Sequence, residues 1–213
     1  MVKDAVRRLM PVSVYLRRHP LEPQLTGGRL DEYLAAVAER GHVEGAVLEV
    51  GCFRGATTVA ACRAMKQAGV RKRYVCVDTF AGFVADQFES DVAHGTPETF
   101  RSGFAENPRE MFDRTMRHLE LEVESIEADI CELDPAGLPP LIAACLMDVD
   151  LAVPIHDGLE KVYPRLARGG IVLVDDCDEG TEWRGARSGY QDFVRTHGLA
   201  ERYTPAGLGI VEK

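Results

Sequence analysis

From residue 46 onward, short apolar runs alternate with longer stretches in which apolar residues recur every three or four positions. The apolar runs are typical of strands buried on both faces of a sheet, and the longer stretches are typical of amphipathic helices. The predicted strands are residues 46–50, 74–77, 123–128, 142–147 and 171–174, and the predicted helices are residues 56–68, 109–118, 154–167 and 185–197. Two further short strands, 201–204 and 208–212, are joined through Pro205-Ala206-Gly207 and predict an antiparallel hairpin at the sheet edge. The pattern therefore predicts an α/β fold with a doubly wound, mostly parallel, Rossmann-like sheet of seven strands.

The length of 213 residues suits one domain with a sizeable core. Residues 1–44 are predicted to be mainly helical, with an amphipathic helix from Asp31 to Arg40, and they carry too little apolar surface to fold alone. We expect them to cap the sheet or an interface in a homo-oligomer, while residues 45–213 form the core. Residues 81–107 are polar and rich in glycine and proline, and a connection of this length is usually a binding loop or a lid.

Composition narrows the range of partners. The net charge is −9 and no basic cluster stands out beyond the N-terminus, which argues against a nucleic-acid partner. No apolar run is long enough to span a bilayer, and the N-terminal stretch lacks a signal-peptide cleavage site, so no membrane association is expected. The six cysteines show no C-x-x-C spacing, and we expect free thiols in a reducing, cytoplasmic environment.

The stretch from Val47 to Thr58 predicts a strand that turns on glycine into a helix. Gly51 permits close backbone approach, and Gly55 permits tight packing of the turn against the helix. Such a turn places backbone N–H groups and a helix N-terminus at one edge of the sheet. The spacing Glu-x-Gly-x-x-x-Gly differs from the Gly-x-Gly-x-x-Gly of dinucleotide-binding enzymes, which disfavours a nicotinamide enzyme.

Acidic residues mark the ends of the predicted parallel strands. They are Glu49, Asp78, Asp129, Asp148 and Asp175. The carboxyl ends of parallel strands share one edge of the sheet, which is where ligands bind in doubly wound folds. Helix capping would account for one or two of these acids. Five carboxylates along one edge are unfavourable unless a cationic or hydroxyl-rich ligand offsets them.

Three of these acids, together with two threonines, match groups of a nucleoside-containing ligand. Asp78 can accept hydrogen bonds from both hydroxyls of a ribose, although an acid there also suits a helix cap. Asp129 can accept from an adenine amino group, and it equally suits a plain turn. Glu49 can pair with an ammonium group, while Thr57 and Thr58 can donate to a carboxylate at the helix N-terminus. Ribose, adenine, ammonium and carboxylate together describe S-adenosylmethionine.

The chain from about residue 46 to 198 resembles the class I methyltransferases, and within them the macrocin O-methyltransferase (TylF-like) family. The resemblance rests on Leu48-Glu49-Val50-Gly51-Cys52-Phe53-Arg54-Gly55, Val77-Asp78-Thr79-Phe80-Ala81-Gly82, Asp148-Val149-Asp150-Leu151, Leu159-Glu160-Lys161-Val162-Tyr163-Pro164 and Gly169-Gly170-Ile171-Val172-Leu173-Val174-Asp175-Asp176. It implies a methyltransferase sheet, S-adenosylmethionine and usually Mg²⁺ as cofactors, and a sugar hydroxyl of a small-molecule acceptor, such as a glycosylated natural product, as the methylated group. The cofactor site is then predicted to comprise Glu49, Gly51, Gly55, Thr57, Asp78, Thr79, Phe80, Asp129, Ile130 and Asp148.

By the same resemblance, Asp148, Asp175 and Asp176 match the metal-binding acids, and Asp150 matches the general base. Three carboxylates at the ends of neighbouring strands, without a nearby histidine or cysteine, favour Mg²⁺ or Mn²⁺ over zinc, and helix capping is the alternative. Asp150 lies two residues beyond Asp148, so both side chains would point to the same face of an extended strand end. His156, in the following helix, is the second candidate for a catalytic role, although a lone histidine is more often structural.

The chain departs from the family pattern where an acceptor would bind. Ala152-Val153-Pro154 stands where the family usually has Tyr-Glu-Ser, and Cys177 stands where an aromatic residue commonly follows the paired aspartates. The sequence therefore leaves two classes of acceptor, a sugar hydroxyl and a catechol or other phenolic hydroxyl. A non-catalytic S-adenosylmethionine-binding protein is the alternative from a different class.

Overall fold

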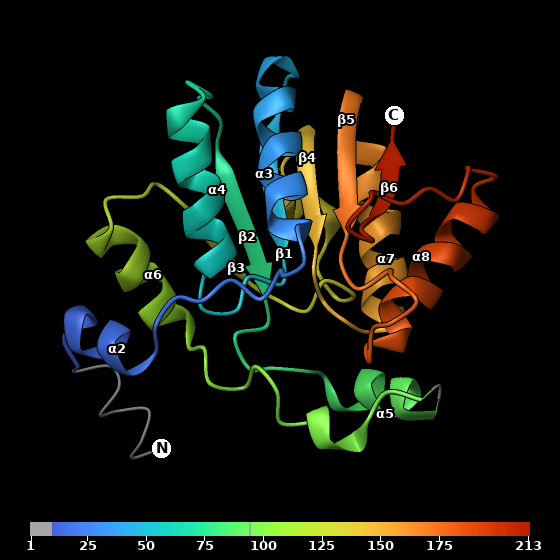
Figure 1. Cartoon of the computed structure of the whole chain (residues 1–213), viewed down its shortest axis with the longest axis horizontal. Helices are drawn as coiled ribbons and strands as arrows, with labels where there is room; N and C mark the ends of the chain where they lie inside the picture. Colours follow the sequence, from blue (N-terminus) through green and yellow to red (C-terminus); the bar gives the residue numbers. More distant parts are fainter. Residues whose placement is uncertain (1–9, 94) are drawn as a thin grey trace.

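A six-stranded sheet with the order β3-β2-β1-β4-β5-β6 organises the residues that the computed structural model describes, 10–93 and 95–213 (Figure 1). The parallel strands are β1 (Ala46–Val50), β2 (Tyr74–Asp78), β3 (Glu124–Glu127), β4 (Ile142–Met147) and β5 (Leu166–Val174), and β6 (Gly209–Glu212) runs antiparallel to β5. β1 is buried along its whole length because β2 and β4 flank it. The chain order reverses on either side of β1, which makes its carboxyl end the point where a ligand is expected.

Helices cover both faces of this sheet. On one face lie α3 (Arg29–Glu39), α4 (Ala56–Gln67) and α6 (Arg109–His118), and on the other lie α7 (Ala152–Val162) and α8 (Arg184–Thr196). Each face has its own apolar core: Val37, Met65 and Met116 pack against the first, and Leu159 and Phe193 against the second. The arrangement confirms the predicted doubly wound, mostly parallel α/β fold.

The predicted seventh strand does not form among the described residues. Residues 201–204 contribute a single antiparallel bridge, between Tyr203 and Gly209. The Arg202 N–H donates to the Tyr190 hydroxyl at 2.9 Å instead of to a strand, and Pro205 lacks an N–H to extend the pairing. The edge hairpin is therefore present, but only β6 belongs to the sheet.

Several helices and strands begin or end at residues other than those predicted from the sequence. The polar segment 81–107 contains a helix, α5 (Ala85–Ala93), and a 3₁₀ turn (Glu98–Phe100), so it is not an extended loop. α7 begins at Ala152 and ends at Val162, and β5 begins at Leu166 instead of residue 171. The shift at β5 has a physical cause: a register irregularity lets Leu166 pair with Ile142 before the main ladder starts at Ile171.

The part of the N-terminal segment between its two helices passes the carboxyl ends of the strands, whereas its second helix, α3, lies on one face of the sheet (Figure 1). The segment contains α2 (Val12–Arg18), an irregular stretch, and α3, and α2 lies beside α6 (Figure 1). The part of the helical prediction that falls on residues 1–9 lies outside the described residues.

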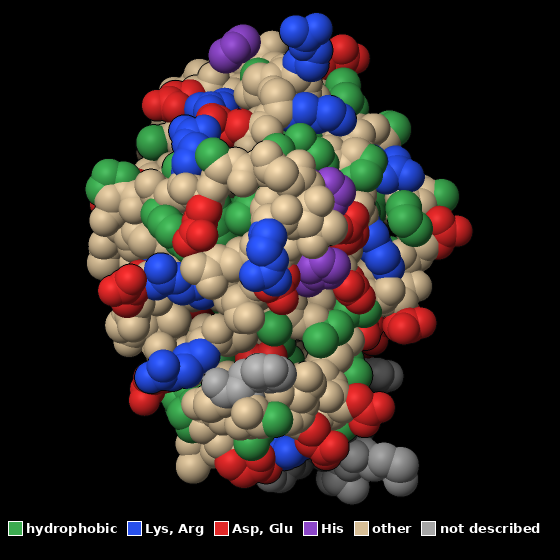
Figure 2. All heavy atoms as spheres, turned by 90° about the vertical axis from the view of Figure 1, so that its right-hand side faces the viewer, with side chains coloured by type: hydrophobic (Ala, Val, Ile, Leu, Met, Phe, Trp, Pro, Cys, Tyr) green, Lys and Arg blue, Asp and Glu red, His purple; other side chains and the backbone are tan. Residues whose placement is uncertain are grey.

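The surface carries charges of both signs, and the cysteines are free thiols. The side of the molecule shown in Figure 2 carries interspersed acidic and basic side chains. No helix in the described part of the chain combines the length and the hydropathy needed to cross a bilayer. The six cysteines are free thiols, as the absence of a C-x-x-C spacing predicts.

Candidate active site

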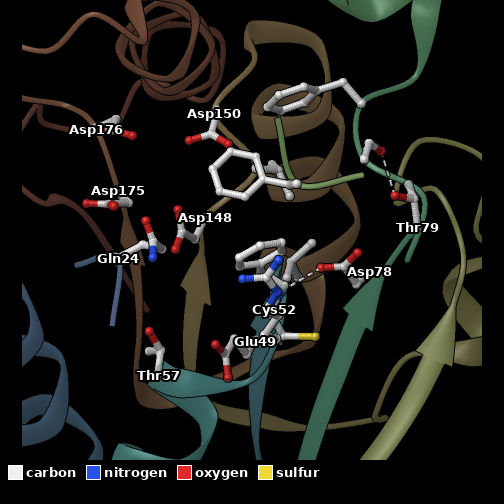
Figure 3. Close-up of a pocket in the computed structure, with 18 of the residues that line it drawn as sticks. Gln24, Glu49, Cys52, Thr57, Asp78, Thr79, Asp148, Asp150, Asp175 and Asp176 are labelled. Atoms are coloured by element: carbon white, nitrogen blue, oxygen red, sulfur yellow. Dashed lines mark hydrogen bonds between the residues drawn. The ribbon is translucent and has the colours of Figure 1, made fainter. Parts of the chain in front are cut away.

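A pocket of about 530 Å³ opens at the carboxyl ends of β1, β2, β4 and β5. Its wall includes most of the side chains predicted from the sequence, several of which are labelled in Figure 3. The predicted residues that line it are Glu49, Gly51, Thr57, Asp78, Thr79, Asp129, Ile130, Asp148, Asp150, Asp175 and Asp176. The tertiary structure thus brings the acids at the strand ends into one cavity.

The turn after β1 requires glycine at position 51. Gly51 has a φ of +85°, and a Cβ placed on it would lie 1.7 Å from the carbonyl oxygen of Asp148. The two chain segments stay this close because Asp148 N–H donates to the carbonyl oxygen of Val50, and Gly51 N–H donates to Val77 O of the other neighbouring strand, β2. Glycine at this position therefore sets the floor of the pocket between β1 and β4.

Asp78 holds the same turn from the neighbouring strand. Its Oδ2 accepts from the backbone N–H groups of Cys52 at 2.9 Å and Phe53 at 2.8 Å. Its Oδ1 accepts from Phe80 N–H at 2.7 Å and, at a longer 3.2 Å, from the Asn107 side chain. The carboxylate thus orders the glycine turn while it lines the pocket.

The other predicted residues on the β2–β3 side are held by local hydrogen bonds. Asp129 accepts from Gln87 Nε2 at 2.7 Å and from Cys131 N–H at 2.9 Å, and Thr79 Oγ1 donates to Gly82 O at 2.7 Å. These contacts fix the two loops that form this wall of the pocket.

Glu49 is a buried carboxyl group with one satisfied oxygen. Its Oε2 accepts from Thr58 Oγ1 at 2.7 Å and from the Tyr74 hydroxyl at 2.6 Å. Its Oε1 is buried and has no hydrogen-bond partner among the described residues. Burial raises the pKa of Glu49 to about 7, against the opposing effect of the Tyr74 and Thr58 hydrogen bonds. A buried acceptor without a donor indicates that a ligand cation or N–H completes this site.

Three carboxylates meet at the ends of β4 and β5. Single oxygens of Asp148, Asp150 and Asp176 lie within 4.8 Å of one another. Burial, followed by repulsion from the neighbouring acids, raises the pKa of Asp148 and of Asp150 well above the usual range. Asp150 and Asp176 also have positive φ values, +60° and +53°, a backbone conformation that residues other than glycine rarely adopt. The oxygen donors and their mutual repulsion fit a hard divalent cation.

This cluster differs from the predicted set in one member. Asp175, which the sequence places among the metal ligands, is replaced by Asp150 in the three-acid group. The chain after β4 is not extended, because Asp150 is left-handed and Leu151 N–H donates back to Val149 O. The turn brings Asp150 next to Asp148 by a route that differs from the predicted extended strand end.

Arg29, from the N-terminal segment, enters the site beside these acids. Its Nη1 lies 2.7 Å from Asp175 Oδ1 and 2.8 Å from Asp176 Oδ1. Burial raises the pKa of Asp175 to about 6, although Arg29 opposes that shift. The sequence contained no local signal for this contact.

Aromatic rings line the other end of the pocket. Trp183, in the loop before α8, lies 5.4 Å from Phe83 and 6.2 Å from Phe104 between ring centroids, and Phe104 is 5.0 Å from Phe53. All four residues belong to the pocket wall. The wall offers flat apolar faces close to the acid cluster.

Three predicted site residues do not reach the pocket. Gly55 packs the turn against α6, since a Cβ there would lie 2.2 Å from Met116. Phe80 is buried against Phe112 in the core, and only its backbone contacts Asp78. His156 lies beside Asp157 at 3.2 Å on the surface of α7, near α8, so a catalytic role for it is not supported by its position.

The strand order, the glycine turn at the switch point and the acid-lined pocket define a Rossmann-like protein with a ligand site at the carboxyl ends of its strands. The model of the macrocin O-methyltransferase (TylF) family matches residues 25–205. The chain therefore belongs to this family and is an S-adenosylmethionine-dependent O-methyltransferase. A comparison with curated protein sequences gives no match.

Solved structures share the fold. The O-methyltransferase NovP is 19% identical with a TM-score of 0.71, over 87% of this chain and 79% of NovP. The calicheamicin methyltransferase CalS11 is 22% identical with a TM-score of 0.66, over 96% of this chain and 86% of CalS11. The SAH-bound Podospora anserina methyltransferase PaMTH1 is 14% identical with a TM-score of 0.58, over 97% and 86%.

Proposed function

We propose that the chain methylates a hydroxyl of a sugar or glycosylated natural product, with a divalent cation at the acid cluster. The observation that carries the proposal is the convergence of Asp148, Asp150 and Asp176 within 4.8 Å in the pocket that also contains the cofactor-type residues. A hydroxyl needs this kind of site because it is a poor nucleophile until its proton is withdrawn. The choice of a sugar is supported by CalS11, which is described as a TDP-rhamnose 3'-O-methyltransferase.

The cofactor would lie along the ends of β1 and β2. Glu49 Oε1, which is buried without a partner among the described residues, would accept from the ammonium group. Thr57, at the N-terminus of α4, would donate to the carboxylate. The long 3.2 Å contact from Asn107 to Asp78 is the one that a ribose hydroxyl can replace. Asp129 and Ile130 would lie at the adenine.

The acids would act on the acceptor. Asp148 and Asp176 would hold the cation. A bound cation would lower the pKa of the acceptor hydroxyl. Asp150 would accept the proton, because its carboxylate lies in the same group of oxygens. The remaining contribution is orientation of the hydroxyl in line with the transferred methyl group.

A phenolic hydroxyl is the second candidate acceptor. Trp183, Phe83 and Phe104 form an aromatic wall in the pocket, and such a wall can stack on an aromatic ring as well as on the apolar face of a sugar. A phenol is also the more acidic hydroxyl and requires less activation.

A panel of sugar and phenol acceptors with isotopically labelled S-adenosylmethionine tests the proposal. We expect transfer to a sugar hydroxyl that is lost in excess chelator and restored by Mg²⁺. Asp150→Asn should lower kcat by about 10²–10⁴, the usual share of general-base catalysis, while calorimetric S-adenosylhomocysteine binding persists. Transfer to phenols alone would favour the second candidate. Binding without turnover on any acceptor would favour a non-catalytic role.

A further inference from the structure

Asp91 is a buried acid that lies in α5, outside the cofactor residues. Its exposed fraction is 0%. Its Oδ1 accepts from the N–H of Ala152 at 2.8 Å, and its Oδ2 accepts from Thr96 Oγ1 at 3.1 Å. A buried carboxylate of this kind is costly unless its contacts are kept, so its position is strongly constrained.

The Ala152 contact places Asp91 at the N-terminus of α7. Leu151 is the N-cap residue of that helix and provides no side-chain cap. Asp91 therefore supplies across space the acceptor that an aspartate or serine normally supplies within the sequence, where the helix dipole also favours a negative charge. This position lies two residues after Asp150, in the loop that carries the acid cluster.

A glycine of α8, Gly185, leaves space for the contact between Asp91 and Ala152. A Cβ on Gly185 would lie 1.8 Å from Asp91 Oδ2 and 2.6 Å from Ala152 N. Gly185 is in the first turn of α8, so α5, α7 and α8 meet here and leave no room for a side chain on residue 185. Asp91 lies where the three helices meet.

The segment that contains Asp91 also forms part of the pocket wall. Phe83, Val84 and Gln87 line the pocket, and Trp183 packs against Phe83 at 5.4 Å and Phe100 at 4.6 Å between centroids. Among its contacts with the rest of the protein, the described part of the segment from Phe83 to Phe104 packs on Trp183 through aromatic rings and is bonded to α7 through Asp91.

We propose that Asp91 is a positioning residue that couples the seating of α5 on the pocket to the geometry of the Asp148–Ala152 loop. When α5 is seated, Asp91 holds Ala152 N–H and the loop keeps Asp150 beside Asp148. When α5 is displaced, the first N–H of α7 loses its acceptor and the loop loosens. The acceptor, which would contact the α5 side of the pocket, thereby helps to order the acid that acts on it. The proposal rests on the proposed role of Asp150.

The test compares Asp91→Ala, Asp91→Asn and the control Asp86→Asn, which removes an exposed acid from the same helix. Hydrogen exchange by mass spectrometry should show peptides covering residues 148–155 exchanging at least about tenfold faster in Asp91→Ala, with β1, β2 and α4 unchanged. The emission of Trp183, the one tryptophan in the sequence, should move to longer wavelength as the aromatic contacts open. Asp91→Asn should restore both signals, because its amide oxygen can still accept from Ala152, and Asp86→Asn should resemble the wild type.

Calorimetry with S-adenosylhomocysteine separates this proposal from the proposed function. We expect dissociation constants within about twofold for all variants, because the hydrogen bonds of Asp91 with Ala152 and Thr96 involve none of the residues placed at the cofactor. Absence of binding in the wild type would contradict the proposed function and not the coupling. Wild-type exchange and emission in Asp91→Ala, or faster exchange throughout the chain, would overturn the coupling.

A variant that keeps the carboxylate covers the case in which Asp91→Ala does not fold. Thr96→Val is nearly isosteric and removes the hydroxyl that donates to Asp91 Oδ2. It should shift Trp183 emission and loop exchange in the same direction by a smaller amount, and no change in either would overturn the proposal.

Discussion

Arg29 and Asp176 lie 147 positions apart in the sequence, and the Arg29 guanidinium donates a 2.8 Å hydrogen bond to the Asp176 carboxylate. The same nitrogen donates to Asp175 at 2.7 Å. The Arg29 side chain is 14% exposed and those of Asp175 and Asp176 are 5% and 11% exposed, so the contact is shielded from solvent. The N-terminal segment is therefore part of the site and not only a cover for the sheet.

Removal of Arg29 should destabilise the fold. Arg29→Met leaves two nearly buried carboxylates without their cation, and we expect the free energy of unfolding at neutral pH to fall by about 3 kcal/mol. Asp175→Asn in the Arg29→Met background should recover part of the loss, because one unpaired charge disappears. Chemical denaturation measures both. Arg195→Gln, which breaks the exposed pair with Asp192, is the control and should change nothing measurable.

Cofactor binding should depend on the ionisation of Glu49. Its pKa of about 7 in the free protein means that the carboxyl is mostly protonated at pH 6 and mostly charged at pH 8. An ammonium group binds the charged form, so affinity for S-adenosylhomocysteine should rise with pH through about 7 and be about tenfold weaker at pH 6 than at pH 8. It should fall again once the ammonium group deprotonates. Calorimetry across this range checks the profile.

Glu49→Gln should bind more weakly and lose the rising limb near pH 7. Glu182→Gln, which removes an exposed acid from the same pocket, should keep that limb. A rising limb that survives in Glu49→Gln would assign the titration to another group.

Gly51→Ala should be far more damaging than its backbone angle explains. Gly51 and Gly69 have similar φ values, +85° and +68°, but a Cβ on Gly69 meets nothing within 4 Å, whereas on Gly51 it meets the Asp148 carbonyl at 1.7 Å. Gly69→Ala should cost about 1–2 kcal/mol of unfolding free energy from the left-handed conformation alone. Gly51→Ala should cost more than about 4 kcal/mol or abolish S-adenosylhomocysteine binding. Equal costs would show that the β1 and β4 loops can move apart.

Divalent-cation binding distinguishes the two acid sets. The three-acid group contains Asp148, Asp150 and Asp176, whereas Asp175 lies outside it, although Arg29 contacts both Asp175 and Asp176. Asp176→Asn and Asp148→Asn should each weaken Mn²⁺ binding at least about tenfold, and Asp175→Asn should weaken it less than about threefold. Calorimetry with Mn²⁺ in the presence of S-adenosylhomocysteine measures this. An equal loss in Asp175→Asn would support the set expected from the sequence.

Strand pattern and local turn chemistry were readable from the sequence. A buried apolar run followed by Gly51 predicts a strand and a tight turn, because only glycine tolerates that backbone with another chain in contact. Parallel strands then place their carboxyl ends at one edge, so Glu49, Asp78 and Asp148 were correctly expected in one cavity. These predictions succeed because each depends on short-range periodicity and on a general property of parallel sheets.

The remaining features depended on tertiary contacts. Whether His156 points into the pocket is set by the rotation of α7 against α8, and Phe80 is buried because Phe112 of α6 packs on it. The contacts of Arg29 with Asp176 and of Asp91 with Ala152 join residues 147 and 61 positions apart. The sequence by itself determined the alternating fold and the acids along its edge. Only the tertiary structure decided that Arg29 pairs with Asp175 and Asp176 and that Glu49 keeps one oxygen without a partner among the described residues, because a buried charge is stabilised by whichever partner the fold brings within hydrogen-bonding distance.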